Sequence, residues 1–372
     1  MQRMTKRTRT TLFFTLALLF LAVTSALIFT ALGYRLDWSG KRITQTGALY
    51  FKVIPSSALV IIDEGKKRRT DFFFGTLLID DLLPGFHDIR VEKEGFAPWH
   101  KLLAIQERQV TEVKNIVLFP SQLSFKTLVD DVLNVWQSSA PNLFLVEQQL
   151  PQGRRLSLWN PKTNKETVLI ARLSFVQQIS GVLWNPEQKT FLVQFNGGTS
   201  LPMAFHEEGD RCTETTCVED ILHMKATQEE VLLAEVAEQL TQTLPGVKES
   251  VVSPDQKKIA FTNGSEIWIL YLQDDEGQPK RTKGDLVFLN RFSSQAANLA
   301  WATSQHLLFS VGKEIRVMEI DDRDSANALV LGSFLASPSQ DNPLLLLFWD
   351  DQEKVIYILN NSTLSVSEKL LR

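Results

Sequence analysis

The residues best suited to local chemistry are two cysteines, Cys212 and Cys217, which lie five positions apart. Outside the cytoplasm this pair predicts a local disulfide that clips a surface loop, because thiols are oxidised in that environment. The closed loop is short, so the bond would stabilise the fold by about 2 kcal/mol or less. His206 and His223 flank the pair, which leaves a zinc site as one alternative and two free thiols as another.

The histidines and acids form no recognised catalytic pattern. Five histidines are widely spaced and no pair has metal-ligand spacing: His87, His100, His206, His223 and His306. The sequence has no nucleophile elbow, phosphate-binding loop, dinucleotide fingerprint or zinc-peptidase motif. Adjacent acids at 80–81, 130–131, 321–322 and 350–351 are expected in solvated turns. We therefore expect no metal and no cofactor, with acid/base catalysis by carboxylates that converge from separate turns as the alternative.

The composition excludes several classes of protein. The chain has 372 residues, with 39 basic and 43 acidic side chains and a net charge of −4. This length suggests two or three domains with a sizeable core. The acidic balance argues against a nucleic-acid binder, which needs a basic surface to neutralise phosphates. Two cysteines exclude a disulfide-stapled miniprotein and a cysteine-rich zinc module.

The first 34 residues predict a membrane anchor. Residues 1–10 carry four cations and no acid, and residues 11–34 carry no charge. As a helix, the uncharged segment would measure about 36 Å, enough to cross a hydrocarbon core of ~30 Å. A secretory signal has a shorter apolar region, and the run continues past the candidate cleavage site at Thr24-Ser25-Ala26. We expect an uncleaved anchor, with a cleaved signal as the alternative.

The charges around this segment predict its orientation. The tail at 1–10 is the stronger positive flank, because the linker at 35–47 has mixed charges. The positive-inside rule then keeps the N-terminus in the cytoplasm. Tyr34 and Trp38 stand where interfacial aromatic residues would anchor the span. The sequence predicts a single-pass plasma-membrane protein that contacts the membrane through Thr11–Tyr34 and has extracytoplasmic domains.

Residues 48–120 have the pattern of a small β domain. Short apolar runs alternate with turn residues, which predicts about five strands in an antiparallel sandwich or sheet. Pro84-Gly85 predicts a tight turn, because proline fixes φ at the first central position and glycine supplies a positive φ at the second. We expect His87 to bond to the backbone of this turn rather than to act as a base.

The order of these residues resembles the PEGA domain. The resemblance is carried by Val53-Ile54-Pro55, by Ala58–Asp63, by Leu83–His87, by Val91–Phe96 and by the terminal Leu118. PEGA domains occur in surface-layer-associated and envelope proteins and are non-catalytic, so the resemblance implies a spacer or binding module. The chain departs from the family after Asp63, where the segment is longer and Thr76 is followed by Leu77.

That longer segment holds a candidate contact surface. Its cations and aromatic residues are Lys66, Lys67, Arg68, Arg69, Phe72, Phe73 and Phe74. A basic run beside aromatic residues can contact an anionic wall polymer, lipid headgroups or a partner protein. We expect instead a solvated hairpin tip followed by a strand whose phenylalanines enter the core, and keep the ligand-contact loop as the alternative.

Residues 121–372 contain a repeated pattern. A strand end, a polar turn and a second apolar strand recur from Trp136, Trp184, Val252, Trp301 and Trp349, at intervals of 48 or 49 residues with one of 68. Further apolar runs supply third and fourth strands, and four strands in about 48 residues is typical of a propeller blade. We predict a mainly β protein with a propeller of about five blades, in which residues 123–128 add a strand to the last blade. A six-bladed or incomplete ring is the alternative. The residues assigned to the repeated pattern are Trp136, Trp184, Pro186, Ser253, Pro254, Asp255, Trp268, Trp301 and Trp349.

One repeat carries a second resemblance. Ser253–Phe261 with Ile267-Trp268 is similar to the repeat of TolB-like, WD-related propellers, although Gln256 stands where that family commonly has glycine. The long interval holds an insertion at about 209–246. Within it, a capping box at 227–230 marks the start of a helical pattern, and Pro245-Gly246 marks its end. We predict an amphipathic helix at about 228–242 that packs on the propeller, with a partner-docking helix as the alternative.

These features together predict a membrane-anchored, non-catalytic binding or scaffold protein of a prokaryotic cell envelope. The propeller face would bind an envelope protein, a peptide or a glycan, and no nucleic acid. One alternative is a propeller-type glycosidase or lyase that acts on envelope polysaccharide. The other alternative is a structural spacer of the cell surface.

Overall fold

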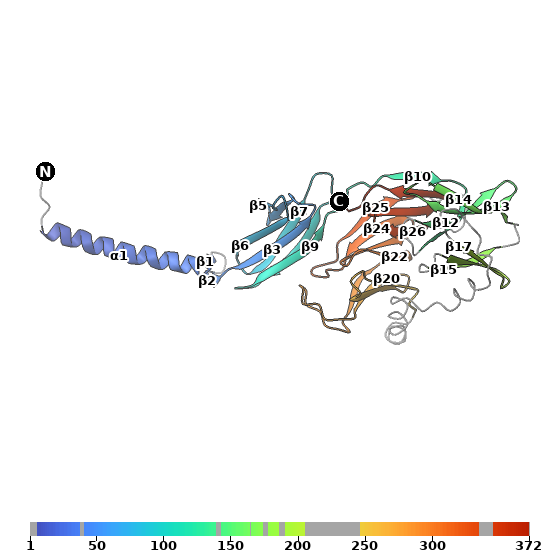
Figure 1. The fold of residues 1–372 in the computed structure, drawn as a ribbon. Coiled ribbons are helices and arrows are strands. Elements are labelled where there is room, and N and C mark those ends of the chain that lie inside the picture. Colours follow the sequence, from blue (N-terminus) through green and yellow to red (C-terminus); the bar gives the residue numbers. More distant parts are fainter. Residues whose placement is uncertain are drawn as a thin grey trace. The chain divides into compact units, whose positions relative to one another are not determined.

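The computed structural model describes residues 6–37, 41–138, 143–163, 165–173, 178–185, 190–204, 246–334 and 345–371. The chain divides into two compact units, each of which is described by itself. The first unit is Met1–Leu118 with Glu276–Pro279, and the second is Phe119–Asp275 with Lys280–Arg372. Both units are mainly β-structure (Figure 1).

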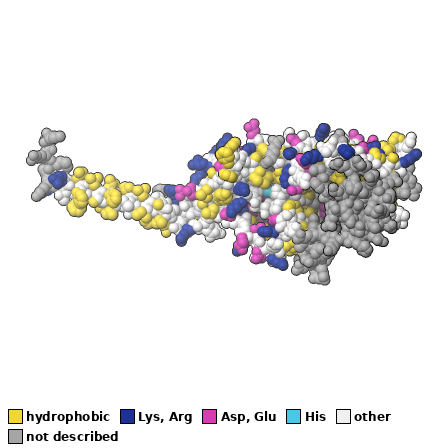
Figure 2. Space-filling view, in the orientation of Figure 1, with side chains coloured by type: hydrophobic (Ala, Val, Ile, Leu, Met, Phe, Trp, Pro, Cys, Tyr) yellow, Lys and Arg dark blue, Asp and Glu magenta, His cyan; other side chains and the backbone are white. Residues whose placement is uncertain are grey.

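The first unit opens with a long apolar helix, α1, at Lys6–Ala31. Its 26 residues give a length of about 39 Å. Large apolar side chains such as Phe14, Phe20 and Leu27 are each more than half exposed, and Figure 2 shows hydrophobic side chains along the length of the helix. The helix is long and apolar enough to cross a membrane, as an anchor or as a signal sequence.

The segment after the helix, where we expected a linker at 35–47, has β-structure of its own. It contains a hairpin of strands β1 (Tyr34–Asp37) and β2 (Arg42–Gln45). The N–H of Thr46 donates to the carbonyl of Gly33 at 2.8 Å, so the hairpin returns the chain to the end of the helix. Trp38 lies outside the described residues.

Two sheets form the body of the first unit and enclose one core. One sheet has the order β6-β3-β9, and the other has the order β5-β4-β7-β8. Alternate side chains of both sheets point inward, so Phe51 and Val53 of one sheet share a hydrophobic cluster with Val60 and Ile89 of the other. The strands are β3 Gly47–Ile54, β4 Leu59–Ile62, β5 Lys66–Arg69, β6 Thr76–Leu82, β7 Gly85–Glu92, β8 Trp99–Ile105 and β9 Val110–Val117.

The pairing in this domain differs from the expected antiparallel arrangement of about five strands. Strands β3 and β9 are parallel, with Phe51 opposite Val113, and β5 is a strand that the sequence analysis took for a loop. The parallel pair joins residues about 60 positions apart in the chain, which is why a local alternation pattern does not reveal it.

The second unit consists of consecutive antiparallel sheets in which each strand pairs with its neighbour in the chain. Four sheets of the described residues have four strands and one has three. The last sheet takes one strand from the start of the unit, because β10 pairs with β28. This pairing agrees with the expectation for residues 123–128.

The strands of the second unit are as follows. They are β11 Val132–Gln137, β12 Phe144–Leu150, β13 Gly153–Asn160, β14 Lys165–Leu173, β15 Ile179–Asn185, β16 Thr190–Phe195, β17 Ser200–Ala204, β18 Glu249–Val252, β19 Lys258–Thr262, β20 Glu266–Tyr271, β21 Leu286–Arg291, β22 Ala296–Thr303, β23 His306–Val311, β24 Glu314–Glu319, β25 Ala328–Ser333, β26 Leu345–Asp350, β27 Val355–Asn360, β28 Thr363–Ser367 and β10 Phe125–Val129.

Burial shows that these sheets are covered on both faces. Leu307, Leu308 and Phe309 follow one another on β23 and are all fully buried. Successive side chains of a strand point to opposite faces, so both faces of this sheet are packed. One cluster joins Phe144 of the first sheet to Tyr357 of the last. Small meander sheets stacked in this way form a mainly β, propeller-like fold.

Four tryptophans of the repeated pattern occupy corresponding positions. Trp136, Trp184, Trp301 and Trp349 each lie on the first strand of a sheet and each pair with an apolar residue on the second strand. The fifth, Trp268, lies instead on the third strand of its sheet, opposite Phe261. The predicted insertion at about 209–246, with its helix at 228–242, lies outside the described residues except for Gly246.

Candidate functional site

Three strongly exposed aromatic residues lie in a turn between β5 and β6, which we call the aromatic turn and define as Asp71–Thr76. The side chains of Phe72, Phe73 and Phe74 are 73, 83 and 76% exposed. The rings of Phe72 and Phe73 meet edge to face, with centroids 5.3 Å apart. The prediction that these phenylalanines enter the core is therefore wrong.

Asp71 holds the turn in shape. Its carboxylate accepts hydrogen bonds from the N–H groups of Phe73 and Phe74, at 2.9 and 2.6 Å, and from the N–H and hydroxyl of Thr76. The hydroxyl of Thr76, followed by the N–H of Phe74, holds the pKa of Asp71 at about 2, well below its usual value of 3.8. The carboxylate therefore stays ionised and directs the backbone so that the rings point away from the core.

Gly75 fixes the other end of the aromatic turn. It has a φ of +67°, and a Cβ built there would lie 2.1 Å from the carbonyl oxygen of Val53. Its own carbonyl accepts from the N–H of Val53 at 2.9 Å, and the carbonyl of Phe72 accepts from the hydroxyl of Ser56 at 2.7 Å. The turn is thus bonded to the end of β3 at Val53 and to Ser56 in the segment that follows. Three exposed phenylalanines held by an ordered backbone form a preformed apolar surface.

The four cations that precede the aromatic turn form β5, an edge strand. All of Lys66, Lys67, Arg68 and Arg69 are exposed, and none forms an ion pair in the described part of the chain. Arg68 and Lys66 donate only to backbone carbonyls, of Lys67 and Asp81. Charged side chains on an edge strand prevent sheets from pairing edge to edge, which is a structural role for the run. That role does not account for the phenylalanines beside it.

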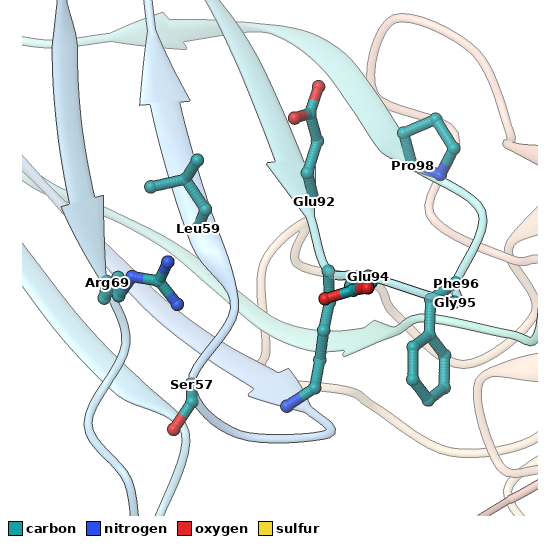
Figure 3. A pocket seen from close by; sticks show the side chains of 9 residues that line it. Ser57, Leu59, Arg69, Glu92, Glu94, Gly95, Phe96 and Pro98 are labelled. Atoms are coloured by element: carbon teal, nitrogen blue, oxygen red, sulfur yellow. The ribbon is translucent and has the colours of Figure 1, made fainter.

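A groove lies next to Arg69 on the outer side of the same sheet. Its volume is about 770 Å³, and Figure 3 shows Arg69 on β5 and Glu92 on β7 with Leu59 of β4 near them. Glu94 and Lys93 also line it. Two cations, Arg69 and Lys93, and two carboxylates, Glu92 and Glu94, line the groove, so it has no charge preference for a small ion. The groove therefore extends the polar surface beside the aromatic turn and is not a separate anion site.

The turn at Pro84 and Gly85 holds His87 as a structural residue. The Nε2 atom of His87 lies 2.7 Å from the carbonyl of Leu83, and Nδ1 lies 2.6 Å from a carboxylate oxygen of Asp63. Gly85 has a φ of +144°. Both ring nitrogens face acceptors within the domain, which leaves neither directed at a solvent-filled site.

The turn between β18 and β19 is closed by its own side chains. The hydroxyl of Ser253 lies 2.5 Å from the carboxylate of Asp255 and accepts from the N–H of Lys258 at 3.0 Å. The ammonium of Lys258, whose side chain is 1% exposed, lies 2.9 Å from Asp255. Burial raises the pKa of Asp255, but hydrogen bonds from Ser253 and Lys258 outweigh it and the pKa falls below its usual value. These residues stabilise a turn and offer no open site.

A small cavity lies between the last and first sheets of the second unit. Its volume is about 280 Å³, with Leu128, Val146 and Trp159 on its apolar side. Ser157 donates to Glu166 at 2.7 Å on its polar side, and Arg155 lies 3.0 Å from the same carboxylate. Such a volume lies at the lower limit for a small-molecule site. It can admit a single side chain or a small polar group.

The three histidines that the structure describes, His87, His100 and His306, form no shared metal-ligating group. His100 lies 3.0 Å from Asp88 on the surface of the first unit. His306 is buried in the second unit, where burial lowers its pKa to about 4. No group of three or more metal-ligating side chains occurs among the described residues. His206, His223, Cys212, Cys217 and Pro186 all lie outside them.

Sequence comparisons give no relative for this chain: no family model matches it, and no curated protein matches it either. Solved structures resemble it distantly. A structure of unknown function from Bacteroides thetaiotaomicron has a TM-score of 0.32 and 11% identity, over 84% of this chain and 90% of that one. Hsv2 with loop 6CD replaced by a Gly-Ser linker has a TM-score of 0.30 and 10% identity, over 86 and 90%. Kluyveromyces lactis Hsv2 has a TM-score of 0.23 and 11% identity, over 87 and 74%. Similarities with such low TM-scores carry no argument about this chain, and its propeller-like fold is inferred from its own strand order.

The sequence contained a signal for the aromatic turn, but we assigned these residues to a buried strand. Three consecutive phenylalanines are typical of a buried strand, whereas Asp71 before them and Gly75 after them are typical of a turn. Asp71 and Gly75 determine the backbone conformation of the turn, and this conformation places the phenylalanines at the surface.

Proposed function

We propose that this protein is a non-catalytic binding protein anchored in the plasma membrane by α1, with both β units outside the cytoplasm. The observation that carries the proposal is the apolar surface of α1 on all sides, because an exposed helix of this kind is stable only in a membrane. Four cations precede the apolar run and favour a cytoplasmic N-terminus.

In this proposal the first β domain is a PEGA-like module, and it separates the second unit from the membrane. The seven strands and the Pro84-Gly85 turn support this assignment. The second unit is a five-bladed, TolB-like propeller whose last blade combines β10 with β26, β27 and β28. The pairing of β10 with β28 supports closure, because it ties the two ends of the unit together.

The propeller is the ligand-binding part of the proposed function. Its ligand is an envelope protein, a peptide or a glycan. Stacked sheets leave loops exposed at both ends of the strands, and such loops bind ligands in many unrelated folds because a rigid scaffold positions them.

The first experiment tests the anchor and its orientation. Protease added to intact cells is expected to remove a C-terminal tag, whereas an N-terminal tag is expected to be protected until the cells are lysed. Carbonate extraction is expected to leave the chain in the membrane pellet. Protection of the C-terminal tag in intact cells, or release of the chain by carbonate, would overturn the proposed topology.

The second experiment tests binding by the propeller. Cross-linking in intact envelopes, followed by purification of the tagged chain, is expected to recover a specific protein or glycan. A chain that lacks the second unit but keeps residues 1–118 serves as the control and is expected not to recover that protein or glycan. Turnover of wall polysaccharide by the purified chain would contradict the non-catalytic part of the proposal.

A further inference from the structure

We infer that the side of the first β domain formed by β5 and the aromatic turn is a second membrane contact, which docks on the surface of an anionic lipid bilayer. The inference rests on the proposed membrane anchor and goes beyond it, because it assigns a lipid-binding role to a folded domain. Phe72, Phe73 and Phe74 would enter the interfacial layer, and the cations of β5 would meet the headgroups.

The exposed phenylalanines favour a fluid surface over a protein pocket. The three rings belong to one turn and are 73 to 83% exposed. Rings this exposed need either a matching cavity on a partner or a layer that adapts to their shape, and the boundary of a bilayer adapts in this way. Leaving three such rings in water is unfavourable, since burial of each removes a large apolar area from solvent.

The charges select the kind of bilayer. Residues 66–74 carry four cations and a single acid, Asp71. The carboxylate of Asp71 is engaged by backbone N–H groups and by Thr76. The four cations form no ion pair in the described part of the chain, so their charge is available to a partner. Basic side chains next to an apolar tip attract anionic headgroups.

The connection to the helix places this surface within reach of the membrane. Thr46 is bonded to Gly33 at 2.8 Å, so β3 begins beside the end of α1. The aromatic turn ends at Thr76, which pairs with Lys52, five residues along β3 from Gly47, or about 17 Å. A domain that lies with its β5 side along the bilayer therefore brings the rings to the surface. Tethering also raises the local concentration, so that a weak contact is sufficient.

Photo-crosslinking of the full-length chain in proteoliposomes tests this inference. Benzoylphenylalanine replaces Phe73 in one sample and Leu102 in the control. Leu102 is 41% exposed and lies on β8, the opposite edge strand of the same sheet. In vesicles that contain phosphatidylglycerol, the lipid adduct at position 73 is expected to exceed that at position 102 about fivefold or more.

Two further samples test the charge dependence. Vesicles of phosphatidylcholine alone, and a variant with Lys66→Gln, Lys67→Gln, Arg68→Gln and Arg69→Gln, are each expected to lower the adduct at position 73 several-fold. Raising the salt concentration to 0.5 M is expected to act in the same direction, because it screens headgroup attraction. An adduct that is indifferent to all three changes would contradict the selection of anionic lipid.

The remaining outcomes separate this inference from the proposed function. Equal lipid adducts at positions 73 and 102, or an adduct with another protein or a second copy of the chain, would overturn the inference and leave the anchor intact. A chain that carbonate extracts from the vesicles would overturn both, because the anchor itself would then fail.

Discussion

The carboxylate of Asp71 accepts a hydrogen bond of 2.6 Å from the backbone N–H of Phe74. This bond and its neighbours point three aromatic rings into solvent, although the hydrogen bonds of Asp71 go to backbone N–H groups and to Thr76 and not to the rings. The local chemistry of one acid thus determines where a large apolar surface lies. Such local relationships lead to five predictions, which concern both units.

Replacement of Asp71 by Asn is expected to loosen the aromatic turn. An amide accepts weaker hydrogen bonds than a carboxylate and has one acceptor oxygen instead of two, so Phe73, Phe74 and Thr76 lose bonds. Chymotrypsin is expected to cut after the phenylalanines several-fold faster in this variant at neutral pH. Asp80→Asn, on an exposed position of β6, is the control and is expected to leave the rate unchanged.

Acid is expected to loosen the same turn. The pKa of Asp71 is about 2 in the folded chain, against 3.8 for the free side chain. As the pH falls, the unfolded form takes up the proton first, so the stabilisation is complete above pH 4 and is lost between pH 4 and 2. Pepsin cleavage at the phenylalanines, corrected for the activity of the enzyme, is expected to accelerate over this range. A constant corrected rate would contradict the assigned role of the carboxylate.

Gly75→Ala is expected to destabilise the first unit. The residue has a φ of +67° and the new Cβ would lie 2.1 Å from the carbonyl oxygen of Val53, so the backbone must move. We expect a loss of about 2 kcal/mol or more in the free energy of unfolding. Gly65→Ala is the matched control, because its Cβ would lie 3.7 Å from the nearest atom. Urea unfolding of the full-length chain in detergent measures both, and an equal effect of the two substitutions would count against the steric explanation.

Gln256→Gly is expected to stabilise the second unit. Gln256 has a φ of +56° in the turn between β18 and β19, a conformation that glycine adopts without strain. Relief of this strain exceeds the larger entropy that glycine gains in the unfolded chain, and leaves about 0.5 kcal/mol of added stability. Lys257→Gly, at the next position, has no strain to relieve and is expected to destabilise. Thermal unfolding in detergent compares the two, and a loss of stability in both would refute the argument.

The stability of the second unit is expected to fall as the pH falls from 6.5 to 4. His306 is buried, with its Nδ1 atom 2.9 Å from the hydroxyl of Thr303 and its ring edge to face with Phe119. Burial lowers its pKa to about 4 from 6.5, so the unfolded chain binds the proton first and acid favours unfolding. A shift of this size corresponds to about 3 kcal/mol.

The variant His306→Gln isolates this effect. Glutamine keeps a polar side chain near Thr303 but does not titrate. The slope of the unfolding free energy against pH between 6.5 and 4 is expected to be smaller in the variant than in the natural chain, whatever its absolute stability. Identical slopes would show that His306 does not cause the pH dependence.

Several elements of the second unit follow from short-range sequence signals. The apolar runs at 307–309 and 355–358 became central strands, and the polar turn at Ser253-Pro254-Asp255 closed on itself. These segments were predictable because short continuous apolar runs and turn residues act within a few positions. The sharing of a sheet between β10 and β28 also followed the expectation, since a repeated pattern that ends one strand short requires a strand from elsewhere.

The sequence by itself determined the apolar helix at the N-terminus, the mainly β character of the rest and the repeat of small meander sheets. These features depend on hydrophobicity and periodicity along the chain. Only the tertiary structure decided that β3 pairs in parallel with β9, that the basic run is an edge strand, and that three phenylalanines are exposed. Those outcomes depend on contacts between distant residues, such as Gly75 against Val53, and on the hydrogen bonds that Asp71 makes once the turn is closed. Hydrophobicity alone would have buried the rings, but the backbone geometry of the turn outweighed it.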